Sequence, residues 1–464
     1  MEKKEQYKRL LSRLASAVLV LMMTGLFAYI WYTFYDSKEI LGETFWRRGN
    51  YVVIALYGAI LCLFYNVFGT LNIGRMRLLE SVLTQVLAIL ATNTVAYLQM
   101  CLIGRWKFLT YVEPVIWLTG MDLIVAVCWV VFTRWSRAKL YPPRKILMVY
   151  GKYSPDNLIR KMSTREDNYD VEETVSIDCG FEEIRAKIEH YHTVVLADIP
   201  DEIRNKLVKY CFEKDVRCYT VPKISDIMIK SSHVVHEFDT ALLLFRNSGL
   251  NVEEKFMKRI LDVVAAVVAL VVFSPFMLLI ALAIKLYDRG PVLFTQERLT
   301  ENGRVFKLYK FRSMRVQQES GDYCLTRKKD DRITPVGKIL RNIHFDELPQ
   351  LFNILKGDMS IVGPRPECPE LAKKYCQIIP EFKYRLKVKA GLTGYAQVYG
   401  KYNTTPHDKL KLDLTYIKHY SIWLDLKLIL LTVKILFQKE NTEGVESWQK
   451  NAATKENLEK IAEK

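Results

Sequence analysis

Two adjacent carboxylates, Asp346 and Glu347, stand near the start of the stretch HFDELPQLFNILKGDMSIVGPRP (344–366). They could do no more than begin a helix, because aspartate is a good N-cap and acids suit a first helical turn. Pro349 would follow where its missing N–H costs little, and Gly357 would end that helix. The residues around the pair decide whether this purely structural interpretation is complete.

Positively charged side chains and two prolines accompany the acidic pair. Arg365 lies between Pro364 and Pro366. Further cations precede the pair in the chain: Lys310, Arg312, Arg332 and Arg341. Any one of these cations is more simply a solvated charge or a contact to a lipid head group, but together they suggest a site.

Acids and cations in this combination suit phosphoryl transfer. Guanidinium groups bind phosphate oxygens through paired hydrogen bonds. One carboxylate can hold Mg²⁺ together with substrate phosphates, and the other can act as a nucleophile that forms an aspartyl-phosphate. Neighbouring residues of a helix do not face the same way, so the two acids can have different roles.

Composition predicts membrane segments joined to charged soluble parts. The chain has 464 residues, enough for two or three domains, and is 50% hydrophobic with 25% charged residues and a mean hydropathy of +0.02. Its nine cysteines form no CxxC pair and no zinc-like cluster, which argues against a disulfide framework and fits a reducing cytosolic face.

The net charge of +16 comes from the two ends of the chain, residues 1–143 and 251–464, whereas residues 144–250 are close to neutral. A basic region can serve nucleic acid, anionic lipid or phosphorylated substrates. The sequence shows no nucleic-acid motif, so membrane lipids and phosphates are the expected partners.

Four apolar stretches fill the first third of the chain, at about 14–33, 51–70, 82–103 and 112–133. Each approaches the roughly 20 residues that cross a bilayer core. Asp122 interrupts the fourth stretch and must face a neighbouring helix. The basic segments MEKKEQYKRLLSR and RWSRAKLYPPRK flank the set, and both are expected in the cytoplasm. Residues 1–143 are therefore predicted to form a four-helix transmembrane domain.

Residues 144–250 have the pattern of a soluble α/β unit. KILMVYG and TVVLADIP are typical of short buried parallel strands, with charged helical segments between them. A single glycine, Gly151, follows the first strand, whereas a dinucleotide-binding fingerprint needs GxGxxG. We expect a Rossmann-like domain with a structural or regulatory role, and a working nucleotide site is the alternative.

A second kind of apolar segment covers residues 258–290 and carries no charge from Val263 to Ile284. Basic residues lie on both sides of it: Lys255, Lys258, Arg259, Lys285 and Arg289. Both ends are therefore expected in the cytoplasm. Ser274-Pro275 stands at its middle, where proline removes a helix hydrogen bond. The pattern predicts a re-entrant helix at about 258–286, broken at Ser274-Pro275, with an ordinary kinked span as the alternative.

The chain closes with an apolar helix and a polar tail. The helix SIWLDLKLILLTVKILF (421–437) contains Asp425, Lys427 and Lys434, which favour an interfacial over a spanning position. Residues 438–464 have the composition of a flexible polar tail.

From about residue 255 to 437 the chain resembles the bacterial sugar transferases, the monotopic phosphoglycosyl transferases that act on polyprenyl phosphate. The matching segments are KRILD (258–262), Ser274-Pro275, Gln296 and Arg298, KFRSM (310–314), DRITPVGKILR (331–341), DELPQLFNILKGDMSIVGPRP (346–366) and GLTGYAQVYG (391–400). The order of four spans, a Rossmann-like insert and this segment is similar to the large members that start capsule or exopolysaccharide repeat units.

The resemblance implies a mainly α-helical catalytic domain over 251–437, with a re-entrant helix and interfacial helices, at the cytoplasmic face of the bacterial cell membrane. It implies that Asp346 attacks the β-phosphate of a UDP-sugar, whose sugar is glucose or galactose, and releases UMP. Undecaprenyl phosphate then takes the sugar-phosphate. Glu347 would be linked to Mg²⁺. The expected phosphate contacts are Arg341, Arg365, Lys310 and Arg312, with Pro364 and Pro366 fixing Arg365. Large relatives also suggest a homodimer.

Two departures from the family pattern leave the local geometry open. His344-Phe345 stands where members usually have a small residue and leucine, and Thr300 stands where a glycine follows the Gln-Arg pair. The alternative function is a membrane-anchored, nucleotide-sensing scaffold with a non-catalytic transferase-like domain. Ordinary glycosyl transfer is a third possibility, which differs because it releases UDP instead of UMP.

Overall fold

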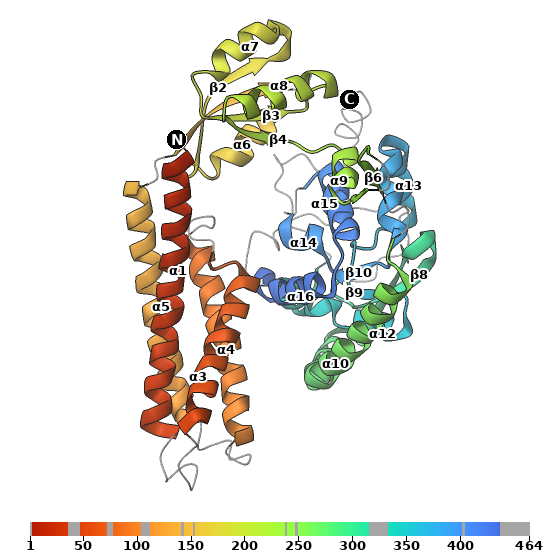
Figure 1. Ribbon diagram of the computed structural model, residues 1–464. Helices are drawn as coiled ribbons and strands as arrows, with labels where there is room; N and C mark the ends of the chain where they lie inside the picture. Colours follow the sequence, from red (N-terminus) through yellow and green to blue (C-terminus); the bar gives the residue numbers. More distant parts are fainter. Residues whose placement is uncertain are drawn as a thin grey trace. The chain divides into compact units, whose positions relative to one another are not determined.

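The computed structural model describes residues 2–35, 47–71, 78–103, 112–140, 143–151, 154–236, 239–245, 249–314, 333–400 and 404–436. They belong to two compact units, Met1–Pro222 and Lys223–Lys464. Figure 1 shows their elements in chain order, coloured from red to blue. Arg332 and the tail 438–464 lie outside the described residues, so the expectations about them stay predictions.

Long apolar helices make up the first part of the first unit. They are α1 (Glu2–Ile30), continued by the π-helical turn η1 (Trp31–Tyr35), α3 (Arg47–Phe68), α4 (Leu78–Ile103) and α5 (Val112–Leu140). These helices cover the four apolar stretches that the sequence predicted. Each packs against the next along the chain, and α1 also contacts α5 (Figure 1). Between α1 and α3, the rings of Phe27 and Tyr57 stack with centroids 4.1 Å apart.

Asp122 of α5 is fully buried among these helices, as its position in an apolar stretch predicted. Its Oδ2 accepts hydrogen bonds from the Tyr57 hydroxyl and from Asn93 Nδ2, both at 3.1 Å. The carboxyl group thus joins α3, α4 and α5. Because apolar surroundings offer a polar group no other partner, such bonds specify how the helices pack.

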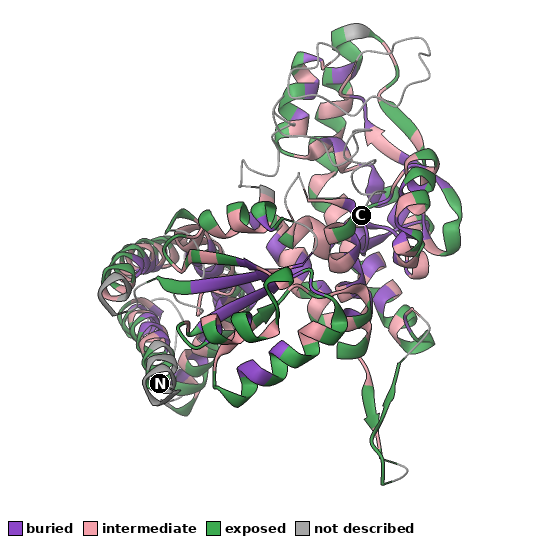
Figure 2. Cartoon of the chain, turned by 90° about the horizontal axis from the view of Figure 1, so that it is seen from above, coloured by how far each residue is buried: buried purple, intermediate pink, exposed green. Residues whose placement is uncertain are grey.

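The rest of the first unit is a parallel sheet with helices. Its elements are β1 (Arg144–Tyr150), α6 (Asp156–Ser163), β2 (Tyr169–Ser176), η3 (Ile177–Cys179), α7 (Phe181–Ile188), β3 (Thr193–Ala197), α8 (Asp201–Glu213) and β4 (Arg217–Thr220). The strand order is β2-β1-β3-β4, all parallel. The two predicted strands, β1 and β3, are central neighbours and largely buried, as their apolar runs require. Figure 2 shows these strands buried among helices with exposed outer faces.

Gly151 closes the end of β1 against the end of β3. Its N–H donates to Ala197 O at 3.2 Å, and a Cβ at this position would lie 2.2 Å from Asp198 O. Gly151 lies between β1 and β3, where the strand order reverses and where ligands of parallel sheets usually bind. The close approach of Asp198 O is nevertheless enough by itself to require glycine here, without any ligand.

Residues 223–250 belong with the second unit, whereas the sequence division placed them with the middle domain. They form α9 (Ile224–Lys230) and the antiparallel pair β5 (His233–Val235) and β6 (Leu242–Leu244). Ile227 and Leu250 are buried in the core of the second unit. Composition changes little at residue 222, so the boundary depends on contacts that the sequence pattern does not display.

The second unit is rich in helices, with two short sheets. After α10 (Val252–Asp288) come β7 (Leu293–Leu299), η4 (Glu301–Gly303), β8 (Val305–Phe311), α11 (Pro335–Asn342), η5 (Phe345–Glu347), α12 (Gln350–Lys356), β9 (Ser360–Val362), α13 (Pro369–Ile378), η6 (Pro380–Lys387), β10 (Gly391–Thr393), α14 (Tyr395–Tyr399), α15 (Pro406–Lys418) and α16 (Ile422–Leu436). β7 pairs with β8, and β9 with β10. Thr334 and Thr405 cap α11 and α15, each with proline at the first helical position.

Helix α10 runs for 37 residues through Ser274-Pro275 and is not divided there. Pro275 cannot donate to the carbonyl of Val271, one turn earlier. The Ser274 hydroxyl donates to that carbonyl instead, at 3.0 Å. The prediction that this serine would satisfy a freed carbonyl is confirmed, while the predicted break is replaced by a continuous helix.

The motif KRILD (258–262) fastens α10 to the second unit. Lys258 Nζ donates to Asp425 Oδ2 at 2.6 Å and to the Tyr416 hydroxyl at 3.1 Å. Arg259 donates to the last carbonyls of α12, and Asp262 accepts from Ser360 and from Ile361 N–H. Lys258 and Arg259 served in the sequence only to place this end of the helix in the cytoplasm, and their internal bonds are a role that the sequence did not reveal.

Two charged side chains of α16 are buried, whereas the sequence suggested that they would be exposed at an interface. Asp425 is fully buried and Lys434 is 8% exposed. They were counted as signs of an interfacial helix, but Asp425 serves the ion pair with Lys258. Apolar side chains, Trp423 and Val433 among them, are the exposed ones.

Five helices in the described part of the chain are long and apolar enough to cross a membrane. They cover Arg13–Tyr35, Arg48–Phe68, Leu78–Ile103, Val112–Ser136 and Val252–Tyr287. This composition fits a membrane protein, as the sequence predicted.

Candidate active site

The acidic pair lies in a single 3₁₀ turn, η5, just ahead of α12. His344 precedes it in a left-handed conformation with φ 57°, which turns the chain sharply after α11. Neither acid makes a capping hydrogen bond, so the interpretation of Asp346 as a helix cap is wrong. Gly357 ends α12 with φ 93°, as predicted.

Glu347 is held by two of the predicted cations. Its Oε1 accepts from Lys310 Nζ at 2.7 Å and from Arg365 Nη2 at 2.8 Å. Lys310 comes from β8, and Arg365 from the extended segment after β9, so three separate parts of the fold meet here. Burial alone would raise the pKa of Glu347, but the charges of Arg365 and Lys310 hold it well below its usual range.

Asp346 is buried with a different environment. It is 9% exposed and accepts no hydrogen bond from any described residue. Burial raises its pKa and the negative charge of Glu347 adds to that rise, while the positive charges of Lys310 and Arg341 oppose it. The two neighbouring acids are thus unlike: Glu347 is bound and ionised, and Asp346 is unbound and desolvated.

The other predicted cations differ in their positions. Arg341, in the last turn of α11, is half-buried and close enough for its charge to act on Asp346. Arg312 is 8% exposed and packs on the backbone of Gly290, where a Cβ would come within 2.2 Å of Nη1. The structure brings Lys310, Arg341 and Arg365 to the acidic pair and places Arg312 against Gly290 instead.

The segment Pro364–Glu367 carries Arg365 and is held along its whole length. All four of its carbonyls accept a hydrogen bond. The donors, in the order of the carbonyls, are Gly391 N–H at 3.0 Å, Arg385 Nη2 at 2.9 Å, Arg298 Nη1 at 3.1 Å and Leu299 N–H at 3.0 Å. Pro364 and Pro366 have no N–H of their own and contribute through their carbonyls and fixed φ.

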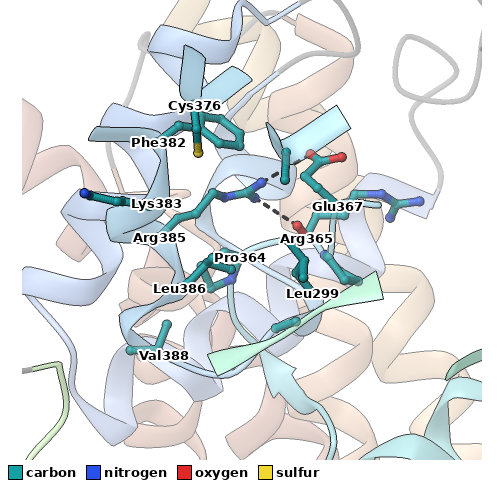
Figure 3. Close-up of a pocket in the computed structure, with 13 residues that line it drawn as sticks. Leu299, Pro364, Arg365, Glu367, Cys376, Phe382, Lys383, Arg385, Leu386 and Val388 are labelled. Carbon is teal, nitrogen blue, oxygen red and sulfur yellow. Dashed lines mark hydrogen bonds and ion pairs between the residues drawn. The ribbon is translucent and has the colours of Figure 1, made fainter. Parts of the chain in front are cut away.

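A partly buried ionic cluster that the sequence did not reveal contacts this segment. It consists of Arg385, Lys409, Glu367 and Asp413. Arg385 donates to Asp413 Oδ2 at 3.0 Å from Nε and to Glu367 Oε1 at 3.2 Å, and Lys409 also bonds Glu367. Arg385 and Glu367 are among the residues that line a small pocket beside this segment. Figure 3 shows the Arg385 side chain extending toward Glu367 and the backbone of Arg365.

One signal of this cluster is present in the sequence. Asp413 stands among Leu410, Leu414 and Ile417 on the buried face of α15. A single acid on an apolar helix face indicates a buried partner. Its partner, Arg385, lies in a 3₁₀ segment with no comparable periodicity.

The two departures noted in the sequence have local structural roles. Thr300 is buried, donates to Asp358 O at 2.8 Å and accepts from Ala390 N–H at 3.2 Å, so its hydroxyl joins two loops. Phe345 packs edge-on against Phe273 of α10, with centroids 5.8 Å apart. Neither side chain displaces a charged group of the site.

The acidic pair offers the small number of protein ligands with which Mg²⁺ is usually bound beside substrate phosphates. No group of three or more His, Cys, Asp or Glu side chains in the described part of the chain could hold a metal. Glu347 uses Oε1 for both cations, and its Oε2 accepts no bond from described residues. One or two carboxylates completed by phosphate oxygens and water is common for Mg²⁺, and Glu347 Oε2 with Asp346 meets that description.

The site lies within the region of the chain that matches a known protein family. The family model described as "Bacterial sugar transferase" matches residues 253–439. The chain is 36% identical over 252 residues to the UDP-N-acetylgalactosamine-undecaprenyl-phosphate N-acetylgalactosaminephosphotransferase of Aeromonas hydrophila, which covers 53% of this chain and 59% of that protein.

Two further relatives carry the name UDP-glucose:undecaprenyl-phosphate glucose-1-phosphate transferase. The protein of Caulobacter vibrioides is 43% identical over 209 residues, 44% of this chain and 78% of its own length. The protein of Klebsiella pneumoniae is 36% identical over 245 residues, 52% of this chain and 51% of its own length. The chain therefore spans little more than half of two of these three relatives.

Proposed function

This chain belongs to the bacterial sugar transferase family, and from that membership we propose that it transfers a sugar 1-phosphate from a UDP-sugar to undecaprenyl phosphate. The observation that carries the proposal is the unlike pair of acids. Asp346 is buried and unbound, whereas Glu347 is fixed beside it by Lys310 and Arg365. A nucleophile next to fixed cations suits displacement at phosphorus.

In the first step, a carboxylate oxygen of Asp346 would attack the β-phosphorus of the UDP-sugar. The bond from that phosphorus to the bridging oxygen breaks, and the oxygen leaves with UMP. An acyl phosphate then joins Asp346 to the sugar 1-phosphate. Arg365 and Arg341 would bind the non-bridging oxygens, where negative charge accumulates. Burial of Asp346 suits this step, because it keeps water from the carboxylate and from the acyl phosphate.

In the second step, an oxygen of undecaprenyl phosphate would attack the same phosphorus. Asp346 leaves as a carboxylate, and the product is a sugar joined to the lipid by a diphosphate. Glu347 would hold Mg²⁺ through Oε2, and the ion would neutralise charge on the phosphate oxygens. Lys310 would keep Glu347 ionised and oriented for that task.

The relatives' names point to the class of sugar. They include glucose, galactose and N-acetylgalactosamine transferases. We propose a hexose such as glucose or galactose for this chain. The role in starting exopolysaccharide or capsule repeat units rests on the same resemblance, since one relative is named galactosyl transferase CpsE.

We also propose that α10 enters the membrane from the cytoplasmic face without crossing it. Both halves of the helix pack on the second unit: Lys258 and Asp262 near its start, and Ile284 near its end. Between them, Val271 and Leu278 are 69% and 72% exposed on the opposite face. A helix that crossed alone would leave one half without these contacts, whereas a helix lying along the unit can present its apolar face to lipid.

Cysteine labelling tests this placement. Val252 and Leu286 are exposed near the two ends of α10, so Val252→Cys and Leu286→Cys can be compared with the labelling of the wild type. Both positions should react with an impermeant reagent only from the cytoplasmic side of membrane vesicles. Reaction of the two positions from opposite sides would contradict the proposal.

We further propose that the parallel sheet of the first unit is a Rossmann-like domain with a structural or regulatory role. The close contact of Gly151 with Asp198 supports this role. Binding of a UDP-sugar or a nucleotide by the isolated region should be absent, and saturable binding would favour the sensing alternative.

Nucleotide release tests the proposed reaction. The wild type is incubated with Mg²⁺, undecaprenyl phosphate and each of a panel of UDP-sugars, and UMP is separated from UDP. We expect UMP from one or a few hexose donors. Asp346→Asn should lose this activity, and Asp239→Asn, the same change at an exposed position, should keep it.

Three outcomes would contradict the proposal. Full activity of a folded Asp346→Asn variant would exclude the covalent mechanism. UDP in place of UMP would indicate ordinary glycosyl transfer. Intact ligand binding without turnover on any donor would favour the scaffold alternative.

A further inference from the structure

Arg365 depends on a segment that cannot hold itself in place. A regular strand fixes each residue by its own N–H and carbonyl, but Pro364 and Pro366 remove two N–H groups next to Arg365. The segment is fixed through its carbonyls instead, and the carbonyl of Arg365 itself is held by Arg385 at 2.9 Å.

Arg385 is built into the fold for this contact. It is 3% exposed, lies in η6, and its guanidinium faces acceptors from two other parts of the chain: Asp413 on α15, and Arg365 with Glu367 on the proline segment. The ring of Phe382 lies 4.9 Å from the guanidinium carbon and limits its movement. A planar fork can serve acceptors in several directions, which a lysine ammonium cannot do in the same fixed geometry.

Arg365 connects Arg385 to the acidic pair. The backbone of Arg365 is held by Arg385, and its side chain, 45% exposed, donates to Glu347 at 2.8 Å. The flanking prolines restrict rotation of the backbone on both sides. A shift of the Arg365 carbonyl is therefore passed to its guanidinium group and to Glu347.

We propose that Arg385 is a positioning residue for the transfer reaction: buried and touching no substrate, it sets the place of Arg365 beside Glu347. This inference rests on the proposed function and goes beyond it, because neither the sequence patterns nor the proposed reaction assigns a role to Arg385. Its effect should fall on the chemical step more than on substrate binding, since misplacement of a catalytic contact chiefly lowers turnover.

The chain offers a matched control in Lys409. It is the other cation on Glu367, but it does not contact the carbonyl of Arg365. Lys409→Gln therefore removes an ion pair from the same cluster and leaves the held carbonyl in place. Arg385→Lys keeps the positive charge and removes the fork.

The experiment measures kcat and KM for UMP release with the donor that the wild type uses, alongside thermal unfolding of each variant. For Arg385→Lys we expect kcat to fall about 10- to 100-fold with KM within about threefold of the wild type. For Lys409→Gln we expect kcat within about threefold. Asp413→Asn, which removes one anion that anchors Arg385, should lower kcat to a smaller extent and serves where Arg385→Lys does not fold.

Each outcome decides the question. A fall in kcat with KM retained in a folded Arg385→Lys or Asp413→Asn variant supports positioning. Turnover close to that of the wild type, a change in KM alone, an equal fall in Lys409→Gln, or failure of both test variants to fold overturns it. Absence of UMP release by the wild type would overturn the proposed function itself, and this inference with it, so the two failures are distinguishable.

Discussion

The membrane helices of the first unit and the core of the second unit each bury a carboxyl group, but with different partners. Asp122 is bonded by the neutral groups of Tyr57 and Asn93. Asp413 is bonded by the guanidinium group of Arg385. Both acids are at most 1% exposed, so the difference lies in the charge of the partner and not in burial.

The comparison teaches what each region has to preserve. A buried ion pair is costly to desolvate, and removal of one partner leaves a charge that nothing neutralises. Neutral donors leave no charge behind, so an uncharged side chain of similar shape can replace the acid. The second unit thus fixes its geometry with charge, and the helices of the first unit fix theirs with shape and hydrogen bonds.

Removing Asp413, the charged partner of Arg385, should give the largest loss of stability. Asp413→Ala leaves Arg385 buried without its main anion, and we expect the free energy of unfolding of the second unit to fall by about 3 to 5 kcal/mol. Chemical denaturation in micelles, followed by circular dichroism, measures the change. The double variant Arg385→Met/Asp413→Leu should recover most of it, and a double variant as unstable as the single one would contradict the ionic explanation.

Acid should weaken the charged cluster next. Burial raises the pKa of Glu367, but Lys409 and Arg385 outweigh burial and lower it from 4.5 to about 2. Its contribution to stability is complete above pH 4.5 and is lost as pH falls toward 2, a loss of up to roughly 3 kcal/mol. Unfolding measured between pH 6 and 2 should show this slope, and Glu367→Gln should flatten it. An unchanged slope in Glu367→Gln would assign the loss to other groups.

The neutral cluster should respond more weakly. Asp122→Leu removes two hydrogen bonds between the helices, and we expect a loss of about 1 to 2 kcal/mol in stability of the first unit. Asp122→Asn keeps the shape and should cost less than about 0.6 kcal/mol. Unfolding of both variants in mixed micelles tests the comparison directly. A loss with asparagine as large as with leucine would show that the charge of Asp122 matters after all.

The smallest loss of stability is expected from removing the single hydrogen bond between the Ser274 hydroxyl and the Val271 carbonyl. Ser274→Ala leaves the carbonyl of Val271 without the donor that replaces the missing N–H of Pro275. We expect a loss of about 0.6 kcal/mol. Ser274→Ala/Pro275→Ala restores a backbone donor and should be at least as stable as the wild type, as measured by thermal unfolding. A double variant less stable than Ser274→Ala would disagree with this account.

Local patterns predicted the elements well. Continuous apolar runs predicted β1 and β3, apolar lengths predicted the four long helices of the first unit, and Gly357 marked the end of α12. These features depend on neighbouring residues, which a sequence displays directly. The nearness of Lys310 and Arg365 to the acidic pair was expected from the resemblance to a family and from the suitability of cations for phosphate, whereas their ion pairs with Glu347 were not expected.

Contacts between distant segments could not be predicted in the same way. The carbonyl of Arg365 is held by Arg385, which lies 20 residues further on in an irregular segment. Lys258 has the spacing of a surface charge, yet its partner Asp425 lies 167 residues further on. Nothing in the local pattern distinguishes such a buried cation from a solvated one.

That separation along the chain has a consequence for synthesis. At about 5 to 20 residues per second, Asp425 leaves the ribosome roughly 10 to 30 s after Lys258. During that interval Lys258 is an unpaired cation ahead of an apolar stretch, and Arg259 still lacks α12, whose carbonyls it will bind. The insertion machinery therefore meets these positive charges, which on the topology proposed above favour a cytoplasmic position for this end. Later the same charges become internal fasteners, so one residue can direct insertion first and hold the finished fold afterwards.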